Sequence, residues 1–470
     1  MTLTNFGGNV TFTPEQRCYP ADYDAVLTIL QRHRGRKIRA IGSLHSWSGA
    51  AVGTGVVVDV RRLDGVDLQT EAGGAVSVQV GAGCTVERLL DKLHRQGGYT
   101  LPVYSIVGKQ TVAGAISTAT HGAGRASLSH YVTALTAAAY DPHSGRPTVY
   151  EWCDGDALWA ARCAVGCSGI VLSVQLQAES DYLIEEQTDW RDRLDDVLER
   201  EDEFPRQQFY LVPWSWKWFV QRRRPLSHDG AGPSKSARAQ RVLRRVGADV
   251  MLNGAFRVLG GTPRWTSGLK WFNRRVLPLV AQPGMDVADY SRNLLMMRHD
   301  LYRHLEMELF VPAAQLHRAA AFVEWTLRCC GGEAARLPDE MDDAFGRDVR
   351  ADIRALQGTY VHDYLITFRR VLSDDTLISM TSGDESAAWY AISLLTYRRD
   401  HAPFLRMAAF LAPAMAAAYR ARPHWGKICP LNTDEIAALY PALPRFRAHC
   451  ASVDPEQVFV NDFARSALGF

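Results

Sequence analysis

The sequence predicts an α+β fold, in which strands and helices alternate at short intervals. Three observations support this prediction. Short β-branched runs bounded by glycine indicate strands, amphipathic segments with capping residues indicate helices, and the long β-α-β rhythm of a doubly wound sheet is absent. In the first 180 residues, we expect strands at 37–41, 56–60, 77–80, 132–140, 148–152 and 170–177, and helices at 20–33, 85–96 and 156–165.

Two of these elements have clear boundaries. In the helix over 85–96, apolar residues share one face, Thr85 can cap the N-terminus, and Gly97-Gly98 ends the periodicity. The strands at 132–140 and 148–152 flank Asp141-Pro-His-Ser-Gly, whose residues are typical of a turn. This pattern predicts a hairpin with a longer loop.

The rest of the chain predicts a second α+β unit. Segments 301–312 and 364–380 are expected to be strands, and the last 50 residues are expected to be helical, ending in an apolar strand at 457–460. We therefore expect a first domain over 10–180, a second over 181–420 and a C-terminal segment over 421–470 that returns to the first domain.

Composition excludes several classes of protein. The 470 residues are 47% apolar and 22% charged, with a net charge of only +2, which does not favour a nucleic-acid binder. Nine cysteines without a Cys-x-x-Cys pair indicate neither a zinc ribbon nor a disulfide scaffold. Residues 1–20 lack a signal-peptide pattern, and no run approaches about 18 uninterrupted apolar residues. We expect a cytoplasmic protein.

An insertion rich in Arg and Trp spans about 213–290. Over Arg206–Arg275 there are 15 Lys or Arg and two Asp, a local net charge of +13. One interpretation is a solvated basic surface with tryptophans packed inward. The other is peripheral contact, through 213–275, with the inner face of a membrane, because Trp prefers the interface and Arg attracts anionic lipid. Both remain open at this point.

The first segment that carries chemistry is Arg39-Ala-Ile-Gly-Ser-Leu-His-Ser-Trp-Ser48. A strand ends at Ile41, and a small turn follows that can direct backbone N–H groups at an anion such as a pyrophosphate. His45 lies in the middle of this turn. A functional role for His45 is one interpretation, but on composition alone a His in such a loop is more often a surface residue or a hydrogen-bonding residue of the core.

A second segment, 101–124, is rich in small residues and hydroxyls around His121. Small side chains let the backbone approach a flat ligand closely, and hydroxyls donate to phosphate or ring oxygens. The alternative is a tightly packed helix start. We favour ligand binding, because the polar run from Ser117 to His121 would need partners if buried.

Two further segments complete a pattern. Val165-Gly-Cys-Ser-Gly-Ile-Val171 and Arg422-Pro-His-Trp-Gly-Lys427, with the earlier two segments, resemble the FAD-dependent vanillyl-alcohol oxidase superfamily. The sequence is most similar there to the sugar-lactone and alditol oxidases, a group that includes gulonolactone and arabinonolactone oxidases. The resemblance is good over 15–180 and 300–470 and poor over 180–300. It implies a two-subdomain, PCMH-type FAD-binding domain followed by an α+β cap that binds substrate.

The resemblance also implies roles for single residues. In these enzymes, the His of the Gly-x-x-His-Ser turn is the attachment point of the flavin, and His45 matches it. Neutral imidazole is a competent nucleophile near neutral pH. A His45 that only hydrogen-bonds a noncovalent FAD is the alternative. The expected cofactor-binding residues are Gly42, Ser43, Leu44, His45, Ser46, Thr111, Gly114, Ser117, Thr118, His121, Gly122, Gly169, Ile170 and His424.

Lys427 and Arg369 match the cationic residues of the family's active site, where a fixed cation stabilises negative charge that develops during the reaction. Thr367 stands where the family has a glutamate that binds sugar hydroxyls, which weakens the expectation of a sugar substrate. Glu306 or Glu308 could supply a carboxylate instead, although alternate strand residues of this kind are more often structural.

The resemblance implies oxidation of a CH–OH group by hydride transfer to flavin N5, with O₂ as the expected acceptor. One alternative is a membrane-associated dehydrogenase that uses another electron acceptor. Another is a flavin-binding interaction protein without turnover. A metal site is not expected, because His299 and His304 do not share a face.

Overall fold

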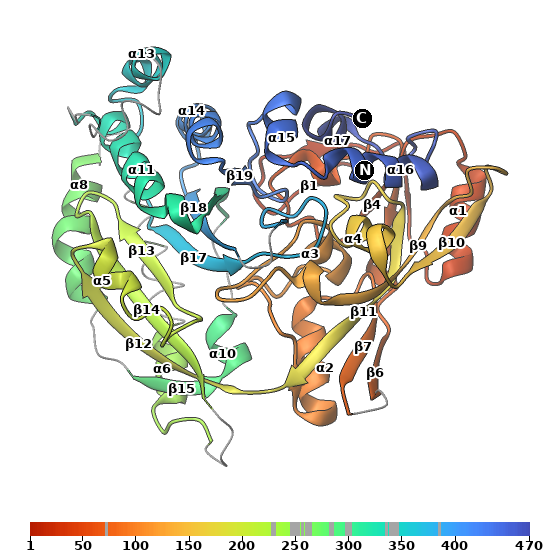
Figure 1. The fold of residues 1–470 in the computed structure, drawn as a ribbon, viewed down its shortest axis with the longest axis horizontal. Coiled ribbons are helices and arrows are strands. Elements are labelled where there is room, and N and C mark those ends of the chain that lie inside the picture. Colours follow the sequence, from red (N-terminus) through yellow and green to blue (C-terminus); the bar gives the residue numbers. More distant parts are fainter. Residues whose placement is uncertain are drawn as a thin grey trace.

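The computed structural model describes most of the chain (Figure 1). The described residues are 1–70, 74–226, 232–244, 254, 258, 266–281, 286–296, 303–333, 337, 347–383 and 387–470. Two short strands, β1 (Leu3–Thr4) and β2 (Thr11–Phe12), pair at the N-terminus.

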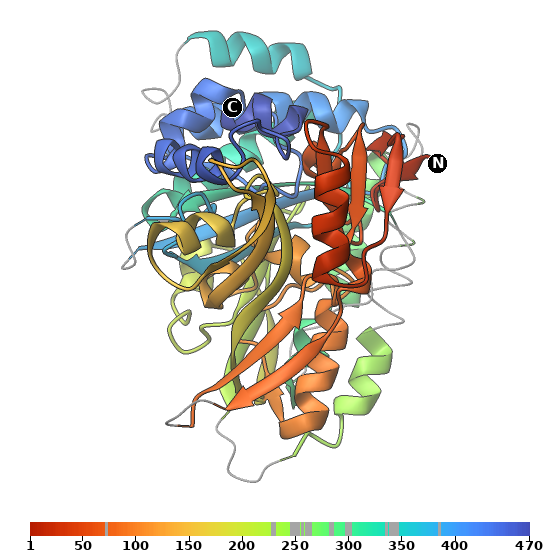
Figure 2. The same cartoon turned by 90° about the vertical axis from the view of Figure 1, so that its right-hand side faces the viewer.

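A small parallel sheet follows. Its strand order is β3 (Gln16–Cys18), β5 (Val56–Asp59) and β4 (Ile38–Ile41). Val56 and Val58 of the central strand have no exposed surface and pack with the helix α1 (Tyr23–Arg32), which lies against the sheet (Figure 2). β4 leads directly into the turn that contains His45.

A second sheet of six strands completes the N-terminal half. Its order is β10 (Pro147–Trp152), β9 (Val132–Tyr140), β11 (Ile170–Ser180), β7 (Val76–Gly81) and β6 (Val66–Thr70), and β8 (Tyr99–Thr100) pairs with β11. The predicted hairpin is confirmed, since β9 and β10 pair antiparallel from Tyr140–Pro147 onwards. Besides α1, this half contains the helices α2 (Val86–Gly97), α3 (Val112–Ser117) and α4 (Gly155–Arg162).

Helix α2 follows its sequence signals closely. The hydroxyl of Thr85 accepts a hydrogen bond from the Arg88 amide, and Gly98 ends the helix with a positive φ of 68°. Val86, Leu89, Leu90 and Leu93 are buried together. Local capping and periodicity therefore determine this element.

The second half is built on an eight-stranded sheet, which the chain enters directly from β11 (Figure 1). Its order is β15 (Val287–Tyr290), β12 (Leu183–Arg191), β14 (Lys217–Leu226), β13 (Gln208–Val212), β17 (Ile366–Leu372), β18 (Ala388–Thr396), β16 (Leu305–Pro312) and β19 (Arg422–Pro423). The strands pair antiparallel throughout.

One face of this sheet is covered by long helices (Figure 1). Apolar residues at alternate strand positions, among them Phe368, Ile392 and Met307, form one core with helices α11 (Leu316–Cys330) and α14 (Ala402–Tyr419). Because successive side chains on a strand point to opposite faces, the residues between them face the N-terminal half. The functional site lies on that second face.

The remaining α-helices among the described residues lie around this frame. They are α5 (Leu194–Leu198), α6 (Ala237–Arg244), α8 (Thr266–Trp271), α9 (Leu277–Val280), α10 (Ser291–Leu295), α13 (Arg347–Leu356), α15 (Thr433–Leu439), α16 (Leu443–Val453) and α17 (Asp462–Leu468). A π-helical turn (Phe272–Val276) joins α8 to α9. At the start of α17, the Asn461 side chain donates to the carbonyls of Gly49 and Val52, so the C-terminal segment contacts the N-terminal half.

One predicted strand was too long, and another does not form. The strand expected over 364–380 ends at Leu372, because the chain then wraps around the buried carboxylate of Asp374, which accepts bonds from Ser127, Thr376, Ser379 and Thr381. No strand forms at 457–460, because Asp454 accepts hydrogen bonds from the amides of Val458 and Phe459, both at 2.8 Å.

Part of the Arg/Trp-rich insertion lies outside the described residues. Trp214 and Trp218 are buried, as the inward-packing interpretation expects, whereas Trp271 is 61% exposed. Among the described residues, α14 is long and apolar enough to cross a membrane by composition alone, but half of it is buried against the core. It therefore packs as a core helix.

Candidate active site

Two adjoining cavities lie between the two halves of the molecule. The narrow cavity has a volume of about 140 Å³, and the wide cavity has a volume of about 320 Å³. The residues that line both cavities are His45, Trp47, Gln110, His424 and Lys427. The two most specific motif residues, His45 and Lys427, thus lie where the cavities meet.

The narrow cavity is a cradle of small residues. Its walls are the turn after β4, the start of α3 and the segment 165–169. A Cβ on Gly42 would lie 2.1 Å from the Thr111 hydroxyl, and one on Gly169, whose φ is +102°, would lie 2.6 Å from the Ala138 carbonyl. The backbone is therefore packed as closely as glycine allows, which suits a long, flat cofactor.

A buried arginine holds this cradle together. The guanidinium of Arg39 donates to the carbonyls of Ala50 at 2.7 Å, Phe459 at 2.9 Å and Gly166 at 3.2 Å. One side chain thereby fastens the His45 turn to two segments far away in the sequence. Hydrogen bonds from a buried charged donor of this kind are stronger than neutral ones.

The turn that contains His45 is hydrogen-bonded to the C-terminal motif. The amide of Trp47 donates to the Gly426 carbonyl at 2.8 Å, and the Ser48 hydroxyl donates to the Trp425 carbonyl at 2.6 Å. These contacts explain how His45 and Lys427 come to share one site.

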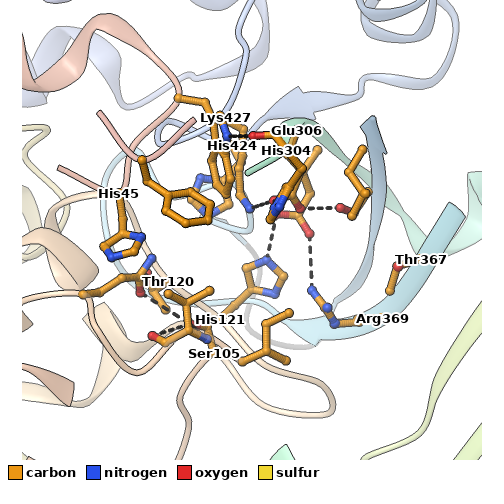
Figure 3. Close-up of a pocket in the computed structure, with 18 of the residues that line it drawn as sticks. His45, Ser105, Thr120, His121, His304, Glu306, Thr367, Arg369, His424 and Lys427 are labelled. Carbon is orange, nitrogen blue, oxygen red and sulfur yellow. Dashed lines mark hydrogen bonds and ion pairs between the residues drawn. The ribbon is translucent and has the colours of Figure 1, made fainter. Parts of the chain in front are cut away.

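The wide cavity has a charged wall on β16. Glu306 forms an ion pair with Lys427 and accepts a hydrogen bond from the Ser393 hydroxyl (Figure 3). Burial raises the pKa of Glu306, but the charge of Lys427 opposes it, and the net shift is downward. The Lys427 ammonium also lies 4.3 Å from the centre of the Trp47 ring.

Glu308, on the same face of β16, lies deeper. Its carboxylate is 3.3 Å from His121 Nε2 and 3.6 Å from Arg369 Nη1. Burial raises the pKa of Glu308, but His121, Lys427 and His424 together outweigh this effect, and the pKa lies well below its usual range. Arg369 also donates from Nε to Gln208 at 2.8 Å.

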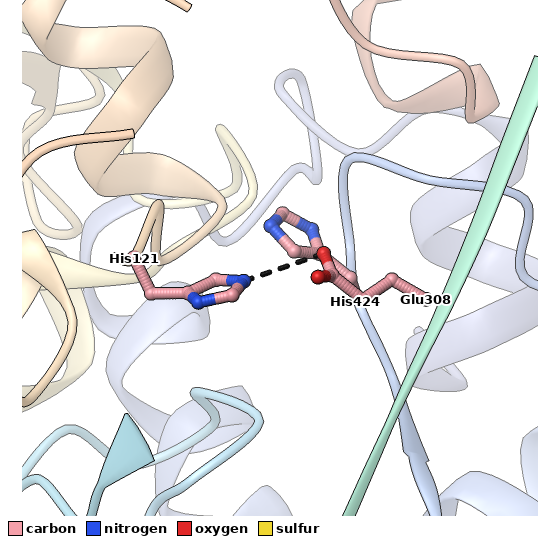
Figure 4. Close-up of side chains that lie close together, drawn as sticks. All are labelled: His121, Glu308 and His424. Carbon is pink, nitrogen blue, oxygen red and sulfur yellow. Dashed lines mark ion pairs between the residues drawn. The ribbon is translucent and has the colours of Figure 1, made fainter. Parts of the chain in front are cut away.

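His424 adjoins this pair. His121, Glu308 and His424 place ligand-type atoms within 4.8 Å of one another (Figure 4). Burial lowers the pKa of His424 to about 3, so its ring is neutral near pH 7, and Nδ1 accepts a hydrogen bond from the Gly426 amide. The positive charge of Arg369 beside Glu308 works against an added cation, so the cluster fits an ion-pair network better than a metal centre.

Four polar side chains form one row across the sheet. Thr367 pairs directly with Tyr210 on one side and Ser393 on the other, and Ser393 pairs with Glu308. Directly paired residues share a face, and all four line the wide cavity. A carboxylate two strands away thus lies in the same row as Thr367.

The structure brings most of the expected residues together. Both catalytic candidates, Lys427 and Arg369, line the wide cavity, as does His121. The cofactor residues that line the narrow cavity are Gly42, Ser43, Leu44, His45, Ser46, Thr111, Gly114, Ser117, Thr118, Gly169 and His424. Gly122 and Ile170 line neither cavity; Ile170 is a buried residue of β11, and Gly122 packs against Tyr104.

Sequence reasoning missed several residues of the site. Gln208, Tyr210 and Ser393 carried no motif, and only the strand order brings them to the wide cavity. For Glu306 and Glu308 a signal existed: two acids at alternate positions in an otherwise apolar strand must share a face. The structure shows that this face is the cavity wall.

Comparison with known proteins agrees with this arrangement. Residues 14–141 match the FAD binding domain family, and residues 174–467 match the D-arabinono-1,4-lactone oxidase family. The chain is 41% identical to a long-chain alcohol oxidase of an uncultured marine euryarchaeote, over 99% of this chain and 96% of that one. It is 25% identical to an L-gulono-1,4-lactone dehydrogenase of Mycobacterium tuberculosis, over 93% and 91%. The solved structure of a solvent-stable cholesterol oxidase shares the fold, with a TM-score of 0.75 and 17% sequence identity. The match covers 100% of this chain and 97% of the cholesterol oxidase chain.

The fold and the site define an FAD-dependent oxidoreductase that acts on CH–OH groups. Within that class, the chain belongs to the D-arabinono-1,4-lactone oxidase family, whose match covers more than half of its length. The resemblance of its motifs to the sugar-lactone and alditol oxidases is thereby confirmed.

Proposed function

We propose that this protein is an alcohol oxidase whose substrate is a long-chain alcohol rather than a polyol or sugar lactone. The observation that carries the proposal is the mixed lining of the wide cavity, in which aliphatic and aromatic side chains accompany the charged side chains near Lys427. Lys427 also borders the narrow cavity, and the aliphatic and aromatic side chains are Phe6, Ile106, Val107, Leu395 and the rings of Tyr210 and Tyr364. The 41% identity to a long-chain alcohol oxidase supports the same substrate class.

The position of Thr367 also favours an alkyl chain. A hydroxyl there binds a second sugar hydroxyl less strongly than a carboxylate would, because hydrogen bonds to charged groups are the stronger kind. A single hydroxyl at one end of an alkyl chain needs only the polar groups near Lys427. The apolar lining then gains by burying the chain, at about 0.8 kcal/mol for each CH₂.

The residues of the site have separate tasks in this reaction. Bound flavin supplies the two-electron acceptor for the hydride. Lys427 places a positive charge where the two cavities meet, close to the reacting hydroxyl. Arg369 pairs with Glu308 and keeps its carboxylate in position in the wide cavity. Because these charges act in a largely buried site, their effect exceeds what they would have in water.

A covalent bond between His45 and the flavin is part of the proposal. His45 borders both cavities, and its ring stacks on Phe6 with centroids 5.1 Å apart. Such packing can hold the imidazole in one orientation for nucleophilic attack. Acid-precipitated protein is expected to stay yellow, and His45→Ala is expected to release the colour into the supernatant. A colourless wild-type pellet would overturn the covalent bond without affecting the alcohol substrate.

The substrate class is tested by measuring the reduction of the flavin without oxygen. The reduction is monitored through the loss of the flavin colour. Primary alcohols of eight to twelve carbons should reduce the flavin fastest. At equal molar concentration, xylitol, sorbitol and aldonolactones should reduce it at least about 10-fold more slowly. Faster reduction by a polyol or lactone would refute the proposal. When air is readmitted, hydrogen peroxide should form in proportion to the alcohol oxidised. If a dye reoxidises the flavin and oxygen does not, the protein is a dehydrogenase instead.

We also propose peripheral membrane contact through the insertion, at the cytoplasmic face. Trp271 and Leu279 are 61% and 70% exposed, and Arg274 and Arg275 are exposed between them. Exposed Trp and Leu beside Arg suit an anionic lipid surface. Vesicles containing phosphatidylglycerol should bind the protein at low salt, and Trp271→Ala/Leu279→Ser should weaken that binding. Equal vesicle binding by the wild-type protein and the variant would favour the interpretation of the insertion as a solvated basic surface.

A further inference from the structure

The wide cavity must also remove a proton, because an alcohol loses its hydroxyl proton as well as a hydride. Among the described residues that line it, the carboxylates are Glu87, Glu306 and Glu308. Resting on the alcohol oxidation proposed above, we infer that Glu306 is the catalytic base that takes the hydroxyl proton, and that Glu308 is a positioning residue.

Glu306 is held ready by contacts to both carboxylate oxygens. Ser393 donates to Oε1, and the Lys427 ammonium pairs with Oε2, which is also 3.9 Å from His304 Nε2. Each carboxylate oxygen has two lone pairs, so these contacts leave acceptor capacity for a substrate hydroxyl. The carboxylate is thus both oriented and able to accept one more hydrogen bond.

Its place in the site agrees with this role. Lys427, the partner of Glu306, borders both the narrow and the wide cavity. A hydroxyl at this junction lies beside the bound cofactor and within reach of Glu306. Glu87 lies on α2 in the N-terminal half, and it lines the wide cavity but not the narrow one.

Glu308 is less suited to accept a proton. Its two oxygens already face the positive charge of Arg369 and the ring of His121, and its side chain is only 2% exposed, compared with 9% for Glu306. Protonation of Glu308 would leave Arg369 with a weakened partner in a buried place. We therefore assign to Glu308 the orientation of His121 and Arg369.

The step balances as follows. The O–H bond of the alcohol breaks and its proton passes to a Glu306 oxygen. The C–H bond on the same carbon breaks and its electron pair leaves with the hydride to the flavin, while the C–O bond becomes a carbonyl. The alcohol is oxidised to an aldehyde by two electrons, and the flavin is reduced by two.

A carboxylate with a lowered pKa is sufficient for this task. As hydride leaves, the hydroxyl turns into a protonated carbonyl, which is a far stronger acid than any carboxylic acid. A base that stays ionised near pH 7 therefore accepts the proton readily. The charged or titratable groups that face Glu306 are Lys427 from the C-terminal segment and His304 and Glu308 from its own strand region.

The decisive comparison is between Glu306→Gln and Glu308→Gln in the purified flavoprotein. Hydride transfer is measured as the anaerobic rate of flavin reduction by 1-decanol. Binding is measured separately with 2-methyl-2-decanol, a tertiary alcohol without a transferable hydrogen, through its perturbation of the flavin absorbance. A Gln oxygen still accepts a hydrogen bond, so Glu306→Gln should bind this probe within about 3-fold of wild type while losing about 10²–10⁴-fold in reduction rate.

Four outcomes separate the possibilities. Partial recovery in Glu306→Asp, with a reduction rate that falls as pH drops below the usual Glu range, supports a proton acceptor. A reduction rate within 3-fold of wild type in Glu306→Gln overturns the inference, as does a change confined to probe binding. Wild-type flavin that no alcohol reduces refutes the proposed function itself, which keeps the two failures distinct.

Discussion

The hydroxyl of Ser46 donates to the carbonyl of Gly426 at 3.1 Å, across 380 positions of the sequence. This bond joins the turn of the proposed flavin attachment to the turn of the proposed catalytic lysine. Together with the Trp47 amide, which donates to the same carbonyl, it fixes the spacing of His45 and Lys427. Two motifs far apart in the sequence therefore meet where the two cavities join.

Replacing Lys427 should impair chemistry more than cofactor binding. Lys427→Met removes the ammonium beside Glu306 but keeps much of the side-chain volume. We expect the anaerobic reduction rate to fall by about 10²–10³-fold, because a fixed charge in a water-poor site is lost. The flavin content, measured by absorbance after purification, should stay within about 20% of wild type. Equal losses of flavin and rate would assign Lys427 a structural role, and Lys427→Arg should recover part of the rate.

Replacing Arg369 should weaken reduction by alcohol by at least about 10-fold. Arg369→Ala removes the guanidinium beside Glu308, whose carboxylate keeps its contact with His121, and it removes the donor to Gln208. Arg370→Ala is the matched control, because the neighbouring side chain points away from the cavity towards Glu201 and Asp202. The measurement is steady-state kinetics with 1-decanol. Unchanged kinetics in Arg369→Ala would remove this residue from the site.

A methyl group on Gly42 should interfere with the cofactor cradle. The added Cβ would lie 2.1 Å from the Thr111 hydroxyl, so the His45 turn or the start of α3 must shift. We expect Gly42→Ala to retain less than about half of the wild-type flavin. Gly65→Ala is the control, since a Cβ there meets nothing within 4 Å. Full flavin content in Gly42→Ala would show that the cradle tolerates the shift.

Asp375 predicts a pH dependence of stability that does not involve the cofactor. Burial raises its pKa, but His130 and Arg162 outweigh burial and lower the pKa to about 2, below the ordinary 3.8. A depressed pKa stabilises the fold above the unfolded value, and this stabilisation is lost as pH falls towards 2. Asp375→Asn should therefore lower the free energy of unfolding by about 2 kcal/mol at pH 7.

Urea unfolding at pH 7 and at pH 3 provides the measurement. The difference between wild type and Asp375→Asn should shrink at the lower pH, because the wild-type carboxylate begins to lose its advantage there. A difference that stays constant between the two pH values would show that packing, and not charge, accounts for the effect. Asp434→Asn, on the first turn of α15, is a control outside this ion-pair cluster.

Local signals determined much of what the sequence predicted. Helix α2 required only Thr85, its apolar stripe and Gly98, and the β9–β10 hairpin required only its turn. The motifs around His45 and Lys427 likewise indicated a flavin site, because close backbone approach and a fixed cation are properties of short segments.

The tertiary structure alone decided which acids face the substrate. The sequence placed Glu306 and Glu308 on one face of a strand, but which face meets the cavity depends on strand order and register across the whole sheet. The pairing of Thr367 with Ser393 and of Ser393 with Glu308 joins β16 to the consecutive strands β17 and β18, which come much later in the sequence. Such pairing is set by the burial of the opposite face against α11 and α14, a non-local property that no single segment of sequence contains.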